Sequence, residues 1–164
     1  MQDFLIIGGG IAGVSAAARL SHIGSLTLIE AEANLAHHAS GRSAALYEPH
    51  YGLPAVVELS LASGDHFRQT ANLLAPRGMM ILGKAGEDAH FDDDIKKMDL
   101  PEVSMDTALA RVPILNPETV KRAARAEHAW VIDIDLLLQN FAREARANGA
   151  TLQTNTRATA ITKT

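Results

Sequence analysis

The feature that most constrains the fold is the stretch FLIIGGGIAGVSAAARL, which occupies residues 4–20. Residues 4–7 form a short apolar run, which is typical of a strand buried on both faces of a parallel sheet. The alanine-rich residues 11–23 predict a helix, and residues 26–30, LTLIE, predict a second strand. A strand, a helix and a strand within about 30 residues match the size of a βαβ unit, so the chain is predicted to have an α/β fold.

The turn between the first strand and the helix, residues 8–13, carries three glycines in the pattern G-x-G-x-x-G. In such a turn Gly8 allows the tight bend, Gly10 lets the backbone approach a pyrophosphate, and Gly13 lets the helix pack closely on the strand. The helix N-terminus then offers free N–H groups to the phosphates. The same glycines also suit a turn that binds nothing, so the motif has to be weighed with its context.

An acidic residue at the end of the second predicted strand supplies that context. Glu30 follows Gly13 by 17 residues, close to the spacing expected for the carboxylate that binds a ribose 2′-hydroxyl. The pattern therefore predicts a Rossmann-like dinucleotide-binding domain with a mostly parallel sheet. A carboxylate repels a 2′-phosphate, so NADP is disfavoured, whereas NAD and FAD both remain open.

The composition excludes several other classes of protein. The net charge of −4 and the pI of about 5.9 argue against a nucleic-acid partner, which needs clustered Lys and Arg. The chain has no cysteine, which excludes disulfides, zinc–thiolate sites and a cysteine nucleophile. No apolar run reaches the length of a membrane span. We expect a cytoplasmic protein, with peripheral association at the inner membrane face as the alternative.

The rest of the chain alternates between helical and strand-like patterns. Helices are predicted at 54–69, 106–115 and 135–148, strands at 78–83 and 126–134, a solvated helix or loop at 87–98, and one or two strands after residue 149. In the last helix, Leu137, Phe141 and Ala145 lie four residues apart and predict one apolar face.

No metal site is predicted. The adjacent His37 and His38 cannot easily face one ion together. Residues 90–94, HFDDD, lack the glycine and the distal glutamate of a calcium loop and are interpreted as a solvated face.

The segment Ser40-Gly41-Arg42-Ser43-Ala44-Ala45, placed after the glycine turn and Glu30, resembles the D-amino-acid oxidase family of flavoproteins. This family comprises FAD-dependent amine and α-hydroxy-acid oxidoreductases, including glycine oxidase, sarcosine oxidase and D-amino-acid dehydrogenases. The spelling SGRSAAxYxxxYG is most similar to bacterial D-arginine dehydrogenase. The stretch from residue 132 to 161 also resembles the helix and strand that return to the FAD domain, whereas residues 70–127 match only loosely.

The resemblance implies FAD as the cofactor. It places Arg42, Ser43 and Ala44 along the pyrophosphate, ribityl chain and flavin, and Ala158 where backbone groups hold adenine. The predicted cofactor-binding residues are Gly8, Gly10, Ile11, Ala12, Gly13, Glu30, Ala31, Ser40, Gly41, Arg42, Ser43, Ala44, Ala45 and Ala158.

The resemblance also implies hydride transfer from an amino acid, a D-amino acid or a secondary amine, to FAD. Tyr51 matches a tyrosine that lines the active site, and His50 is a second catalytic candidate that does not stand at a matching position. Leu46 replaces a histidine of the D-arginine enzymes, and an acid of theirs is missing around Met79. A small or apolar amino acid is therefore favoured over D-arginine.

The resemblance implies a division into two domains. Residues 1–72 and 132–164 are predicted to form part of the FAD-binding domain, and residues 73–131 the first part of an antiparallel substrate domain. Family members are more than twice this long, so we expect an N-terminal portion that is inactive alone. Its expected partners are an amino-acid substrate and the remainder of the enzyme or a partner subunit.

Three further interpretations stay open. Exposed sheet edges favour a homo-oligomer or strand exchange. The chain could also be a non-catalytic nucleotide-binding remnant or subunit. An NAD-dependent dehydrogenase domain is the weaker alternative.

Overall fold

The computed structural model describes residues 2–162 and divides into two compact units. The first unit comprises residues 1–45 and 133–164, and the second unit comprises residues 46–132. Residues 46–72 belong to the second unit, although the sequence analysis assigns them to the FAD-binding domain. A compact unit and a functional domain are different divisions of a chain, so the predicted domains stay a prediction.

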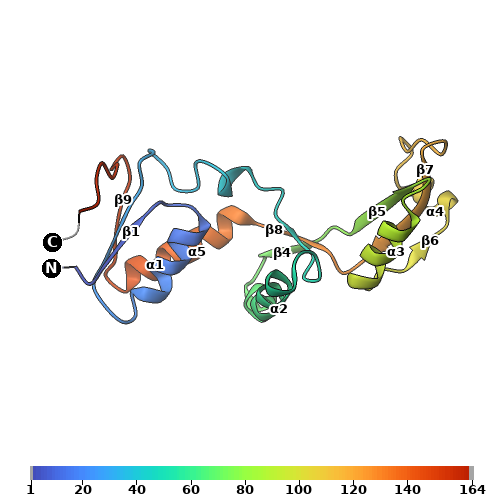
Figure 1. Cartoon of the computed structure of the whole chain (residues 1–164). Helices are drawn as coiled ribbons and strands as arrows, with labels where there is room; N and C mark the ends of the chain where they lie inside the picture. The colour runs from blue at the N-terminus through green and yellow to red at the C-terminus, as the bar shows by residue number, and fades with distance from the viewer. Residues whose placement is uncertain (1, 163–164) are drawn as a thin grey trace. The chain divides into compact units, whose positions relative to one another are not determined.

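The first unit is built on a parallel sheet with the strand order β1-β2-β9, and Figure 1 labels its strands β1 and β9. Its strands are β1 (Phe4–Ile7), β2 (Leu26–Ile29) and β9 (Thr151–Gln153). In register, Phe4 pairs with Leu26 and Leu28 pairs with Leu152. The parallel pairing of β1 with β2 across a helix confirms the predicted α/β fold.

Two helices pack together in the first unit, α1 (Ile11–Leu20) and α5 (Ile134–Ala147). Their buried residues are Val14, Ala17 and Ala18 of α1, and Leu137, Leu138, Phe141, Ala142 and Ala145 of α5. Small alanine side chains on both helices allow the close approach, and the predicted apolar face of α5 is confirmed. Asp133 caps the N-terminus of helix α5, because its side chain accepts a hydrogen bond of 2.9 Å from the Leu136 N–H.

Strand β1 is not buried on both faces, which corrects the prediction for residues 4–7. Leu5 and Ile7 are 61% and 51% exposed. Side chains alternate across a strand, and Ile6 lies on the face toward α1, beside Gly13. Leu5 and Ile7 therefore point to the opposite face, where no described residue covers them well.

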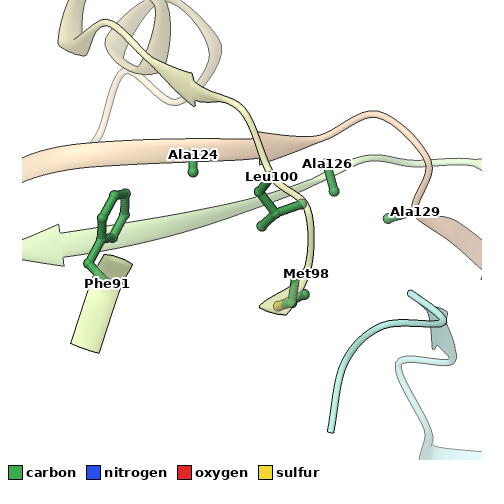
Figure 2. Packing of buried hydrophobic residues seen from close by; sticks show 6 residues of the cluster. All are labelled: Phe91, Met98, Leu100, Ala124, Ala126 and Ala129. Atoms are coloured by element: carbon green, nitrogen blue, oxygen red, sulfur yellow. The ribbon is translucent and has the colours of Figure 1, made fainter. Parts of the chain in front are cut away.

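The second unit contains an antiparallel sheet with the strand order β5-β7-β6. Its strands are β5 (Met79–Lys84), β7 (Val120–Ala126) and β6 (Glu102–Val103), with helices α3 (Asp88–Lys97) and α4 (Met105–Arg111). Phe91, Met98 and Leu100 pack against Ala124, Ala126 and Ala129 to form its core (Figure 2). The predicted antiparallel segment is therefore confirmed.

A second antiparallel sheet in this unit has the strand order β3-β8-β4. It consists of β3 (Leu46–Tyr47), β8 (Trp130–Ile132) and β4 (Leu74–Pro76), and helix α2 (Pro54–Gln69) follows β3. Tyr47 of β3 connects α2 to this sheet, because its hydroxyl donates a hydrogen bond of 2.9 Å to the carbonyl of Ser60 in α2. Its ring also meets Phe67 edge-on at 5.1 Å.

Several predicted elements have different bounds in the structure. The strand expected at 126–134 is two strands, β7 and β8, and β7 begins at Val120. Its charged and alanine residues gave no strand signal. Helix α4 ends at Arg111, before Pro113, and residues 154–162 form no strand after β9. Among residues 2–162, no helix combines the length and apolar character needed to cross a membrane.

Candidate dinucleotide site

The glycine turn, residues 8–13, connects β1 to α1 in a conformation that its glycines permit. Gly8 has a φ of +108°, which L side chains rarely adopt. A Cβ at position 13 would overlap the Gly8 carbonyl oxygen. Both glycines are therefore needed for the helix to start directly above the strand, as the motif predicts.

The N-terminus of α1 opens at Gly10, which precedes the helix with extended backbone and has no side chain to cap it. The first N–H groups of a helix have no partner within the helix. The Ile11 N–H donates to the Ser40 hydroxyl at 2.9 Å, and the Val14 N–H donates to the Gly10 carbonyl at 3.0 Å. The structure thus brings Ser40, from a distant part of the chain, to the helix end where the sequence predicts a pyrophosphate.

Glu30 follows β2, and only 9% of its surface is exposed. Its Oε2 accepts the Gly9 N–H at 2.6 Å, and its Oε1 accepts the Glu32 N–H at 2.8 Å. The hydrogen bonds from Glu32 and then Gly9 lower the pKa of the Glu30 carboxyl. The carboxylate is therefore held ionised beside the glycine turn, with lone pairs left to accept hydroxyl groups.

The short helix η1 (Ser40–Arg42) holds the second predicted segment beside the glycine turn. The Gly41 N–H donates to the Ala36 carbonyl at 2.9 Å, and the Ala36 N–H donates to the Gly9 carbonyl at 2.9 Å. A Cβ at Gly41 would overlap the Ala36 carbonyl oxygen. The two segments are thus joined by backbone hydrogen bonds.

The remaining predicted cofactor residues are less constrained. Arg42, Ser43 and Ala44 are exposed, and Ser43 accepts the Ala45 N–H at 3.0 Å. Ala12 and Ala158 are also exposed, and Ile11, Ala31 and Ala45 are half-buried. Arg42 to Ala44 are therefore accessible from solvent.

The two predicted catalytic residues lie in the second unit. His50 and Tyr51 border a cavity of about 270 Å³, which Ile81 and Met98 also line. Tyr51 is 68% exposed. His50 also contacts the buried Glu48, a residue that sequence reasoning did not select.

The adjacent histidines lie close to one acidic residue. The His37 and His38 rings meet edge-on at 4.9 Å, and one ligand atom from each lies within 4.8 Å of a Glu32 carboxylate oxygen. Both histidines are exposed. Exposed groups of these kinds commonly gather without an ion, so the expectation that these histidines form no metal site stays a prediction.

A family model described as FAD dependent oxidoreductase, DAO, matches residues 3–164. The chain belongs to this family of FAD-dependent oxidoreductases. FAD is the cofactor of the family, which agrees with the flavin resemblance of the sequence. As a member of the DAO family, the chain carries the glycine turn and Glu30 within the matched residues.

Solved structures share the fold of this DAO-family chain. L-α-glycerophosphate oxidase from Mycoplasma pneumoniae, solved with FAD bound, is 22% identical with a TM-score of 0.80. That match covers 96% of this chain and 46% of the oxidase. Glycine oxidase from Bacillus cereus is 20% identical with a TM-score of 0.76, and the match covers 100% of this chain and 50% of that one.

A second glycine oxidase, from Geobacillus kaustophilus, is 19% identical with a TM-score of 0.73. It matches over 94% of this chain and 46% of its own. The DAO-family chain therefore spans about half the length of these solved relatives.

Proposed function

We propose that the first unit binds the ADP part of FAD. The pyrophosphate binds at the N-terminus of α1, and the hydroxyl groups of the adenosine ribose donate hydrogen bonds to the Glu30 carboxylate. The proposal rests on one observation above others, which is that Glu30 is buried, ionised and held by the Gly9 N–H at 2.6 Å. A carboxylate fixed beside a glycine turn accepts hydrogen bonds from ribose hydroxyl groups and repels a 2′-phosphate.

The residues present fit that group. The Ala12 and Gly13 N–H groups belong to the first turn of α1 and have no partner within the helix, and the dipole of α1 favours an anion there. Gly10 has no Cβ to keep a phosphate away. On binding, the phosphate competes with Ser40 for the Ile11 N–H.

We further propose roles for the exposed segment after η1. Arg42 supplies a positive charge for the pyrophosphate, and Ser43 and Ala44 contact the ribityl chain and the flavin. Gly41, Ala45 and Ala31 let the backbone approach the cofactor closely, and Ala158 offers backbone groups to adenine. These roles rest on the resemblance and on the exposure of Arg42 to Ala44.

We propose that the whole protein oxidises an amino acid, either a D-amino acid or a secondary amine. Bound FAD supplies the hydride acceptor for such a reaction. Tyr51 orients the substrate, and His50 is the second candidate for that role. Leu46 and Met79 offer no charge for a basic side chain, which favours a small or apolar substrate over D-arginine.

FAD titration tests the cofactor proposal. We expect the purified chain to bind FAD. Glu30→Gln should weaken binding by about 10- to 150-fold, because one charge-assisted hydrogen bond is worth roughly 1.5–3 kcal/mol. Flavin fluorescence quenching measures the affinity, and calorimetry confirms the stoichiometry. The matched control is Glu32→Gln, which removes a neighbouring carboxylate whose side chain contacts His38 and not the Gly9 N–H.

Several outcomes would contradict the proposal. Equal affinity in wild type and Glu30→Gln would remove Glu30 from the site. Binding of NAD in place of FAD would favour a dehydrogenase domain. Failure to bind either nucleotide, with an intact circular dichroism spectrum, would favour a non-catalytic remnant.

A further inference from the structure

A buried carboxylate lies between two histidines in the second unit, away from the glycine turn in sequence. Glu48 follows β3, His50 lies two residues later, and His128 lies two residues before β8. Antiparallel pairing of Tyr47 with Trp130 brings the two chain segments together. The Glu48 side chain is only 1% exposed.

The three side chains converge on one point. Glu48 Oε1 lies 3.1 Å from His50 Nδ1 and accepts the His50 backbone N–H at 2.9 Å. Glu48 Oε2 lies 3.0 Å from His128 Nε2, and the two imidazole rings are 5.7 Å apart at 84°. One ligand atom from each residue falls within 4.8 Å of the other two.

Two atoms of the cluster lack a hydrogen-bond partner among the described residues. Glu48 Oε2 and His128 Nε2 are both buried and face each other without the alignment of a hydrogen bond. A buried carboxylate oxygen needs a compensating donor or cation, because the protein interior solvates charge poorly. Both unpartnered atoms are of the kind that ligates a metal ion.

We propose that Glu48, His50 and His128 bind a divalent transition-metal ion of the zinc type. Two imidazole nitrogens and one carboxylate oxygen are a common three-ligand set for zinc. With bonds of about 2.0–2.1 Å, neighbouring ligands of a tetrahedral ion lie about 3.3 Å apart. The 3.0 Å from Glu48 Oε2 to His128 Nε2 is close to this spacing, and one ligand atom of each of the three residues lies within 4.8 Å of the other two. The positive ion neutralises the Glu48 charge and accepts lone pairs from both unpartnered atoms, Glu48 Oε2 and His128 Nε2.

The burial pattern leaves room for a fourth ligand. The His50 and His128 side chains are 38% and 36% exposed, whereas Glu48 is enclosed. The ion therefore has an enclosed carboxylate on one side and two partly exposed imidazole rings on the other. A water molecule or a donor group of a small ligand completes the coordination.

The second cluster, Glu32 with His37 and His38, provides a contrast. Its histidines are exposed, and none of its atoms is a buried unpartnered group. Exposed acidic and imidazole groups commonly gather without an ion, so we assign no site to it. It serves as an internal control in the same chain.

Zinc titration of the chain after treatment with EDTA tests the proposal. Calorimetry should show one tight zinc ion per chain, and Co²⁺ should give the visible absorption of a tetrahedral site. We expect His128→Ala and Glu48→Gln to weaken zinc binding at least 100-fold. His50→Ala should weaken it as well, and His38→Ala should leave it unchanged.

Folding is checked for each variant by circular dichroism and by the melting temperature. His50 is the most exposed of the three ligands, so His50→Ala keeps the test valid if a core variant misfolds. Absence of stoichiometric zinc binding to the wild type would overturn the proposal. Zinc binding that His50→Ala leaves unchanged, or that His38→Ala abolishes, would overturn it too.

Discussion

The Glu30 side chain is buried and negatively charged, and a buried charge in a folded chain needs compensating partners. Two backbone N–H groups, from Glu32 and Gly9, compensate this charge in the first unit. The Gly9 hydrogen bond exists only because the glycine turn places its backbone beside the end of β2. The glycine turn thus helps to keep the Glu30 carboxylate ionised, through the Gly9 N–H.

Glu30 should make folding stability depend on pH. The pKa of its carboxyl is lower in the folded chain than the unfolded value of about 4.3, so the folded state favours the ionised form. The stabilisation is therefore present above about pH 4.3 and is lost as the pH falls through the folded pKa. We expect Glu30→Gln to lower stability at pH 7, and the gap to wild type to narrow below about pH 4.3.

Urea unfolding of both proteins at a series of pH values measures this gap. Glu32→Gln is the control, because its side chain accepts no backbone N–H of the turn. A gap that stays constant from pH 7 to about pH 3 would show that the Glu30 charge is not preferentially stabilised by folding.

The core of the β5-β7-β6 sheet depends on one aromatic residue of α3. Phe91 is 2% exposed, and a Cβ at Gly83 would lie 2.9 Å from its ring, so glycine is needed beneath it. The Arg122 guanidinium lies 4.4 Å from the ring centroid and forms an ion pair with Glu102 at 2.8 Å. Helix α3 is thereby fixed on the sheet, because its Phe91 ring packs against the paired residues Gly83 and Arg122.

We expect Phe91→Ala to lower the free energy of unfolding of the second unit by about 3–5 kcal/mol, because it leaves a cavity in the core. Trp130 is the one tryptophan of the chain and lies in this unit, so its fluorescence reports the transition. Ile114→Ala is the control, since Ile114 is 91% exposed. A loss below about 1 kcal/mol for Phe91→Ala would contradict the assigned core.

Helix α2 forms where its sequence predicts, yet several of its apolar side chains are exposed. Leu59 is 70% exposed, and Val56 and Leu61 are 49% and 48% exposed. Helical periodicity is a local property, so it predicts that a helix forms. It does not predict which neighbour, if any, lies against each face.

At the scale of the whole molecule, the chain spans about half the length of its solved relatives. We propose that it is not sufficient for turnover, because it corresponds to only about half of each of these flavoproteins. The FAD-loaded chain should therefore show no oxidation of D-alanine, glycine or sarcosine. A dye-coupled assay and an oxygen electrode together cover both classes of electron acceptor.

The positive control for this assay is an active glycine oxidase under the same conditions. Turnover by the isolated chain, abolished by Tyr51→Phe, would overturn the proposal of insufficiency and would support a role for Tyr51. Turnover that survives this change would remove Tyr51 from catalysis as well.

Local patterns in the sequence determined the α/β unit of this protein. The glycine turn, the apolar strands and the periodicity of α5 each lie within a short stretch, and the physical rules that govern them are local too. The spacing from Gly13 to Glu30 predicted the acidic residue at the turn, and the structure places the carboxylate there. The local patterns did not distinguish FAD from NAD, and the family resemblance identified FAD as the cofactor.

Only the tertiary structure decided which distant residues meet. The pairing of β3 with β8 joins Glu48 to His128 across about 80 residues, and no spacing rule indicates that contact. Most of strand β7 was not predicted, because its pairing with β5, and not its composition, makes it a strand. The exposure of Leu5 and Ile7 likewise depends on what covers the sheet, since a strand's burial is set by its neighbours and not by its own sequence.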